Sequence, residues 1–117
     1  MIHKYKFKFY INARHSVNFT GVQSNIHPHT WEVVLYINVN QNEFINFTKI
    51  EKEFESYFNM YEGKYLNQLE CFTKVQPTME NIAVKIFNDL EKLSNSNLDI
   101  DRIEVSENPT RTYIIQK

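Results

Sequence analysis

Cysteine and glycine are scarce in this sequence, and their scarcity excludes several classes of protein. The single cysteine, Cys71, excludes an internal disulfide framework. The only two glycines, Gly21 and Gly63, exclude the glycine-rich loops that hold phosphates and dinucleotides. No apolar run approaches the roughly 18 residues that a membrane span needs. We therefore expect no membrane partner and no nucleotide loop.

An excess of charge of one sign is also absent. The chain has 13 basic and 14 acidic residues, for a formal net charge of -1. The basic footprint of a nucleic-acid-binding domain is therefore missing. The first residues are charged and lack the apolar core of a signal peptide. These features predict a cytoplasmic protein that does not bind nucleic acid.

The residues that are present suffice for one folded core. The chain has 117 residues, of which 42% are apolar and only 23% are charged. This length and composition predict a single domain over residues 1–117 and exclude disorder as the main state.

Two segments alternate with the two-residue period of a half-buried strand. In the first, apolar and lysine side chains fall on opposite faces: Tyr5, Phe7, Phe9 and Ile11 against Lys4, Lys6 and Lys8. The second runs from Trp31 to Val39. The polar segment between them, Ala13 to Ile26, is too long for a tight hairpin and is predicted to be a functional loop. A short strand is expected around residues 43–47.

Two helices are predicted after these strands. The residues Thr48 to Glu51 fit a capping box at the start of the first helix. Its apolar face comprises Ile50, Phe54, Tyr57 and Phe58. The second helix is expected to begin at Pro77-Thr78 and to end at residues 94–97. Its apolar stripe comprises Ile82, Ile86, Leu90 and Leu93.

Two short strands are predicted at the C-terminal end, around Val105 and Tyr113, with a turn at Asn108-Pro109. The order of strands, helices and strands indicates an α+β domain with both helices on one face of an antiparallel sheet. Such a sheet leaves one face and its edges to be covered. Oligomerisation is the expected cover.

Histidines form the first candidate site. His27 and His29 are two residues apart, so their side chains point to the same side of an extended backbone. Two imidazoles on one face can bind zinc, and His15, at the end of the first strand, is the natural third ligand. The alternative is a pair of surface histidines near a loop.

Two further residues carry possible chemistry. Glu107 lies at a strand end, where its carboxylate can accept paired N–H donors from a heterocycle; alternatively it is an exposed glutamate. Cys71 is a nucleophile or base if its thiolate is stabilised, and otherwise a buried or idle thiol.

Five segments together resemble the family of 6-pyruvoyl- and 6-carboxy-tetrahydropterin synthases. They match the family patterns F-x-A-x-H, HGH, D-H-K-x-L-N, P-T-x-E-N and V-x-E in order. In this chain they are residues 11–15, 27–29, 62–67, 77–81 and 105–107. The fourth match is complete, and the five span nearly the whole chain.

The resemblance implies a T-fold, in which a four-stranded antiparallel sheet carries two helices on one face. Such units assemble around a β-barrel, typically as trimers that pair into hexamers. The family binds zinc through residues that match His15, His27 and His29, and it acts as a lyase on 7,8-dihydroneopterin triphosphate. By the same resemblance, Glu107 anchors the pterin ring and Thr78 assists in the pocket.

The proton-transfer residues of the family are replaced here. Gln23 stands where the family has its catalytic cysteine, and an amide has no useful basicity, so we expect Gln23 only to contact substrate. Glu62 and Gly63 stand where the family has an Asp–His pair. If turnover survives, Cys71 or Glu62 is the candidate base.

Three hypotheses follow from this pattern. The first is a zinc-dependent pterin lyase with a relocated base. The second is a catalytically inactive zinc- and pterin-binding protein. The third is an interaction module that kept only the fold. The resemblance leaves open whether the pathway is that of tetrahydrobiopterin, queuosine or folate.

Overall fold

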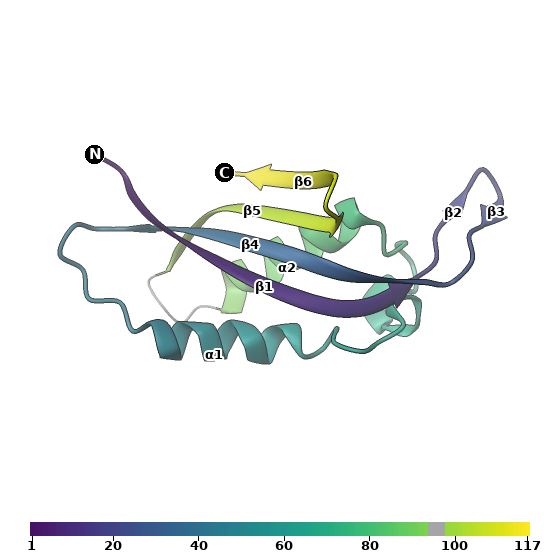
Figure 1. Cartoon of the computed structure of the whole chain (residues 1–117), viewed down its shortest axis with the longest axis horizontal. Helices are drawn as coiled ribbons and strands as arrows, with labels where there is room; N and C mark the ends of the chain where they lie inside the picture. The colour runs from purple at the N-terminus through teal and green to yellow at the C-terminus, as the bar shows by residue number, and fades with distance from the viewer. Residues whose placement is uncertain (94–97) are drawn as a thin grey trace.

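The computed structural model describes residues 1–93 and 98–117. The predicted end of the second helix, at residues 94–97, lies outside the described residues. Within the described part, one four-stranded sheet crosses the molecule and two helices lie on one side of it, as Figure 1 shows. This arrangement confirms the α+β class and the two-layer architecture that the sequence predicts.

The sheet has the strand order β1-β4-β5-β6, and every neighbouring pair is antiparallel. Its strands are β1 (His3–His15), β4 (His27–Val39), β5 (Asp99–Asn108) and β6 (Arg111–Gln116). Alternate residues of β1, from Phe9 to His15, are buried, as expected for a strand with one face on the core.

The strands β1 and β4 pair along their whole length, from His3 opposite Val39 to His15 opposite His27. The predicted loop from Ala13 to Ile26 is therefore too long, because the pairing continues to His15 and resumes at His27. The remaining residues form a small hairpin of β2 (Asn18–Phe19) and β3 (Val22–Gln23). This hairpin projects beyond the end of the sheet in Figure 1.

The first helix, α1, spans Phe47–Phe58. No strand occupies residues 43–47 in this described segment, so that prediction is wrong. The cap also differs from the prediction: Asn46, not Thr48, accepts a hydrogen bond from the backbone N–H of Lys49 at 3.1 Å. An asparagine with extended backbone just before a helix satisfies a free N–H group as well as threonine does.

The second helix, α2, spans Met79–Leu93, and its buried residues are Ile82, Ala83, Ile86, Phe87 and Leu90. Leu93 is exposed, so the predicted stripe ends one turn earlier. Two single turns of 3-10 helix, η1 (Leu66–Gln68) and η2 (Glu70–Phe72), lie between the helices. No helix in the described ranges is long and apolar enough to cross a membrane.

The core lies between the sheet and the two helices, and it ends close to the histidines. It contains Phe9 and Ile11 of β1, Trp31 of β4 and Ile86 of α2, among others. The opposite face of the sheet carries charged side chains: Tyr36 lies between the cations of Lys6 and Arg102. One face therefore stabilises the fold by apolar burial, and the other carries charge.

The segment after α1 covers part of the free edge of β1. The backbone N–H of Gly63 donates to the carbonyl of Asn12 at 2.7 Å, and the N–H of Arg14 donates to the carbonyl of Lys64 at 2.9 Å. Because backbone groups alternate between the two sides of a strand, Lys4, Lys6, Lys8 and Tyr10 turn theirs to the same edge.

Candidate metal and ligand site

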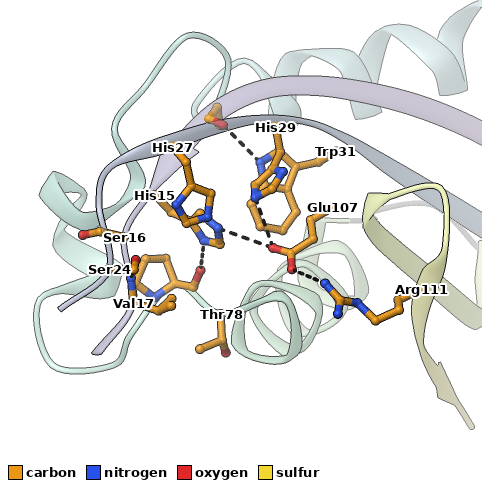
Figure 2. A network of polar contacts seen from close by, with 12 residues as sticks. His15, Ser16, Val17, Ser24, His27, His29, Trp31, Thr78, Glu107 and Arg111 are labelled. Atoms are coloured by element: carbon orange, nitrogen blue, oxygen red, sulfur yellow. Dashed lines mark hydrogen bonds and ion pairs between the residues drawn. The ribbon is translucent and has the colours of Figure 1, made fainter. Parts of the chain in front are cut away.

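Three histidines converge where β1 ends and β4 begins. His15 lies directly opposite His27 in the β1–β4 pairing, and His29 lies opposite Ala13, one pleat further along. One ligand atom from each imidazole lies within 4.8 Å of the others. The side chains point toward one another in Figure 2, and the indole of Trp31 packs against His15 and His29.

Backbone carbonyls orient two of these rings. Nδ1 of His15 lies 2.7 Å from the carbonyl oxygen of Pro77, and Nδ1 of His27 lies 2.8 Å from that of Asn25. A carbonyl oxygen can only accept, so Nδ1 carries the proton in each ring and Nε2 keeps its lone pair. Metal-binding histidines are commonly held by such outer contacts.

The inward-facing nitrogens lack partners. Within residues 1–93 and 98–117, Nε2 of His15 and Nε2 of His29 are buried and have no hydrogen-bond partner. Burial lowers the pKa of both imidazoles, which favours the neutral form that binds metal. Buried polar atoms without partners are costly, and a bound cation would satisfy them. The donor set therefore fits zinc.

Glu107 brings a carboxylate to the same point from β5. Its Oε2 lies 3.4 Å from Nε2 of His15 and 3.6 Å from Nε2 of His29. Its Oε1 lies 3.6 Å from the guanidinium of Arg111, whose side chain is 66% exposed. Figure 2 shows the carboxylate between the imidazoles and the arginine.

A hollow of about 340 Å³ opens beside this cluster. Its lining includes His15, His27, Thr78, Glu107 and Arg111. Its volume falls at the lower end of the range typical of small-molecule pockets, about 300–1,000 Å³. The site therefore combines convergent nitrogens, one carboxylate, one cation and a concave space.

Thr78 directly precedes α2 and borders the hollow. Its Oγ1 accepts from the backbone N–H of Asn81 at 3.1 Å, which caps the helix. The preceding residue, Pro77, supplies the carbonyl that orients His15. One short segment thus starts the helix and sets the tautomer of a candidate ligand.

Gln23 lies in a different hollow, which also includes Asn67 and Gln76. Its Nε2 donates to Oγ of Ser16 at 2.6 Å, and that oxygen also contacts the hydroxyl of Tyr65 at 2.9 Å. The structure therefore does not bring the Gln23 side chain into the hollow beside the histidines.

Glu62 lies at the free edge of β1. Its carboxylate accepts from the backbone N–H of Asn12 at 2.9 Å and from the side-chain amide of Asn12 at 3.1 Å. Both carboxylate oxygens are thus engaged in holding the edge. Glu62 does not line the hollow formed by this chain.

Cys71 lies in η2 and is half-buried. Burial raises the pKa of its thiol, although Lys85 opposes this shift. Like Glu62, it does not line the hollow. The structure therefore groups His15, His27, His29, Glu107 and Thr78, and it separates Gln23, Glu62 and Cys71 from them.

Sequence reasoning missed three contributors to the site. Arg111 was not singled out, although it follows Glu107 by four residues across the turn into β6. The carbonyl groups of Pro77 and Asn25 carry no sequence signal, because every residue has a carbonyl.

Comparison with known proteins agrees with this fold. A family model described as 6-pyruvoyl tetrahydropterin synthase matches residues 4–117. The chain belongs to this family. The described fold is its T-fold, and the family's activity is that of a tetrahydropterin synthase-type lyase. A search of curated proteins by sequence found no match.

Solved structures of the family are similar over their whole length. The 6-pyruvoyl tetrahydropterin synthase of Caenorhabditis elegans has a TM-score of 0.87 at 16% identity, covering 100% of this chain and 96% of that one. A catalytic-residue mutant of the Plasmodium vivax enzyme has a TM-score of 0.77 at 16% identity, covering 100% and 98%. The Plasmodium falciparum enzyme has a TM-score of 0.73 at 17% identity, covering 99% and 98%.

Proposed function

We propose that this chain is a zinc-dependent pterin lyase of the tetrahydropterin synthase type that acts on 7,8-dihydroneopterin triphosphate. One observation carries the proposal. Buried Nε2 atoms of His15 and His29, without partners among the described residues, face a carboxylate beside a hollow of about 340 Å³.

His15, His27 and His29 would hold the metal. When bound, zinc would polarise oxygen atoms of the ligand as a Lewis acid and stabilise negative charge that develops on them. The carbonyl groups of Pro77 and Asn25 keep the protons of His15 and His27 on the outer nitrogens. These contacts thus fix the directions in which the Nε2 lone pairs of His15 and His27 point.

Glu107 and Thr78 would bind the pterin ring. An ionised carboxylate can accept two parallel N–H bonds from a 2-amino-4-oxo ring, a strong kind of hydrogen bond. Arg111, which borders the same hollow, adds positive charge that suits a phosphorylated substrate. Gln23 lines a separate hollow. In this proposal it contacts substrate only if a neighbouring copy adds residues to that hollow.

A second candidate function is pterin binding without turnover. The position of the candidate bases favours it: neither Glu62 nor Cys71 lines the hollow of its own chain, and the thiol of Cys71 has a raised pKa. Turnover would then require that one of these residues act in the site of a neighbouring subunit.

Assembly into a trimer or hexamer is part of the proposal. β1 and β6 are the outer strands of the sheet, and each has an edge that no other strand of the described residues covers. Pairing of β1 in one copy with β6 in the next would close the sheets into a barrel and satisfy these edges.

The test measures metal content and products on one purified sample. We expect about one zinc per chain, as for a three-histidine site. Incubation with 7,8-dihydroneopterin triphosphate should give a pyruvoyl-, carboxy- or hydroxymethyl-pterin by mass spectrometry. Cys71→Ala or Glu62→Gln should abolish turnover and leave zinc and pterin bound.

The outcomes separate the candidate functions. Zinc and pterin binding without product in the wild type would favour the binding protein. In that case Glu107→Ala should weaken pterin binding by more than about 1.5 kcal/mol, the low end for a hydrogen bond to a charged group. A wild-type protein without zinc would contradict both candidates.

A further inference from the structure

The position of the Glu107 carboxylate is not explained by binding of a pterin ring alone. Its Oε2 does not point into open space but toward Nε2 of His15 and Nε2 of His29, at 3.4 Å and 3.6 Å. Both nitrogens are buried and have no hydrogen-bond partner in the described part of the chain. The oxygen is therefore close to both nitrogens without a hydrogen bond to either.

Protons cannot readily explain this approach. Nδ1 of His15 donates to the carbonyl of Pro77, so the neutral imidazole presents a lone pair at Nε2. An ionised oxygen and a lone pair repel each other at this distance unless a cation lies between them.

The distances suit a metal-centred arrangement. Bonds of about 2.0–2.1 Å from zinc at tetrahedral angles place neighbouring ligand atoms about 3.4 Å apart. The two separations of Oε2 match this edge length closely. The atoms that lie within 4.8 Å of one another come from the three histidines alone, and Glu107 lies at this edge length from two of them, His15 and His29. A small approach of Oε2 toward His27 would let three imidazoles and one carboxylate fill the four positions that zinc usually takes.

We infer that Glu107 is the fourth ligand of the metal in the resting protein. This inference rests on the three-histidine site of the proposed function, but it adds that the resting metal is closed to water. Oε2 binds the metal, while Oε1 faces Arg111 at 3.6 Å. A pterin that pairs with Glu107 would have to take this carboxylate from the metal, and Arg111 is placed to attract it.

Cobalt-substituted protein provides the test. The visible absorption of tetrahedral Co²⁺ reports its direct ligands, and competition with a chelator gives the Zn²⁺ affinity. We expect Glu107→Gln to weaken Zn²⁺ binding at least tenfold, the lower bound for outer contacts of metal sites, and to shift the cobalt spectrum. The matched control is Glu104→Gln: Glu104 lies on the same strand but pairs with Arg102 at 2.7 Å, and it should change neither property.

Three results would overturn the assignment. Unchanged affinity and spectrum in Glu107→Gln would leave the carboxylate as a ring anchor only. Weaker affinity with an unchanged spectrum would mean that Glu107 acts through its charge alone. No metal in the wild type would remove the proposed zinc site itself, and that failure is visible before any variant is made.

Discussion

At the level of single residues, His15 is the most constrained group of the candidate site. It is fixed by its pairing opposite His27, by the Pro77 carbonyl and by the indole of Trp31. Its position and packing are set by β4, and its tautomer is set by the segment that precedes α2. This is the kind of support that a metal ligand needs to keep its geometry.

Cys71 offers a residue-scale prediction about pH. Burial raises the pKa of its thiol above the ordinary value of 9.0, so the reactive thiolate is scarce at neutral pH. We expect alkylation by iodoacetamide to be slower than for glutathione at pH 7 and to keep increasing above pH 9. Because Cys71 is the single cysteine, mass spectrometry reads the rate without ambiguity.

The opposite result would change the view of this residue. If the rate levelled off near pH 7, the thiolate would be stabilised by groups outside this chain. A neighbouring subunit would be the source of that stabilisation, and the role of Cys71 as a base would gain support.

The candidate site also shows which contacts a residue pattern can predict and which it cannot. The spacing of His27 and His29, and the placing of His15 at the end of a strand, predict the cluster because alternation in a strand is a fixed geometric rule. The contacts of Glu107 with the histidines could not be predicted in this way. They depend on how β5 lies beside β4, and no local pattern encodes that distance.

At the level of elements, the start of α1 shows where sequence reasoning fails. Asn46 and Thr48 are both good capping residues, and the capping-box pattern favoured Thr48. The chain after β4 runs without a strand until Asn46, so the helix begins two residues earlier than the pattern indicates. Helix ends are decided by the path of the incoming chain as well as by residue type.

This difference gives a matched pair of variants. Asn46→Ala should lower the free energy of unfolding by about 1 kcal/mol, because the N–H of Lys49 loses its acceptor. Thr48→Ala lies inside the first turn and should change it by less than about 0.5 kcal/mol. Urea denaturation followed by circular dichroism measures both. A larger loss in Thr48→Ala would restore the capping-box interpretation.

The two helices are also joined by a polar contact that their apolar stripes do not predict. The hydroxyl of Tyr57 donates to Asp89 at 2.6 Å and lies 2.6 Å from the hydroxyl of Tyr61. Lys85 completes the group with a 3.0 Å ion pair to Asp89. Tyr57 was predicted as an apolar face residue, and its ring does pack beside the core, but its hydroxyl ties α1 to α2.

At the level of the whole molecule, the main elements of the fold could be predicted from the sequence. The oligomer stays a prediction. Alternation and helical spacing predict the order and orientation of the main elements, because each follows from which side must be buried. The small β2–β3 hairpin was not predicted, since its residues are exposed and carry no apolar alternation. The edges of β1 and β6 are the places where further copies of this chain would pair.

A proline at the β1 edge would test the barrel. The N–H of Lys8 points to the free edge, by the alternation that directs the N–H groups of Asn12 and Arg14 there. Lys8→Pro removes this donor without breaking the pairing with β4, and edge strands tolerate proline. We expect the trimer or hexamer to dissociate, while Lys8→Ala keeps it.

Light scattering after size-exclusion chromatography reads the mass of each form, and circular dichroism shows that the fold persists. If Lys8→Pro kept the mass of the wild type, this part of β1 would lie outside any interface. A wild-type monomer would contradict the barrel altogether.

The pairing of His15 with His27 also determines where the chain can change length. All three imidazoles are placed by the ladder below the β2–β3 hairpin, so the tip at Thr20 and Gly21 is free to accept an inserted peptide without moving them. Loss of one residue from the middle of β1 is different: it would turn His15 to the opposite face of the sheet. The hairpin tip is thus a suitable point for attaching a tag or a label. Bound metal would then report whether β1 and β4 keep their register.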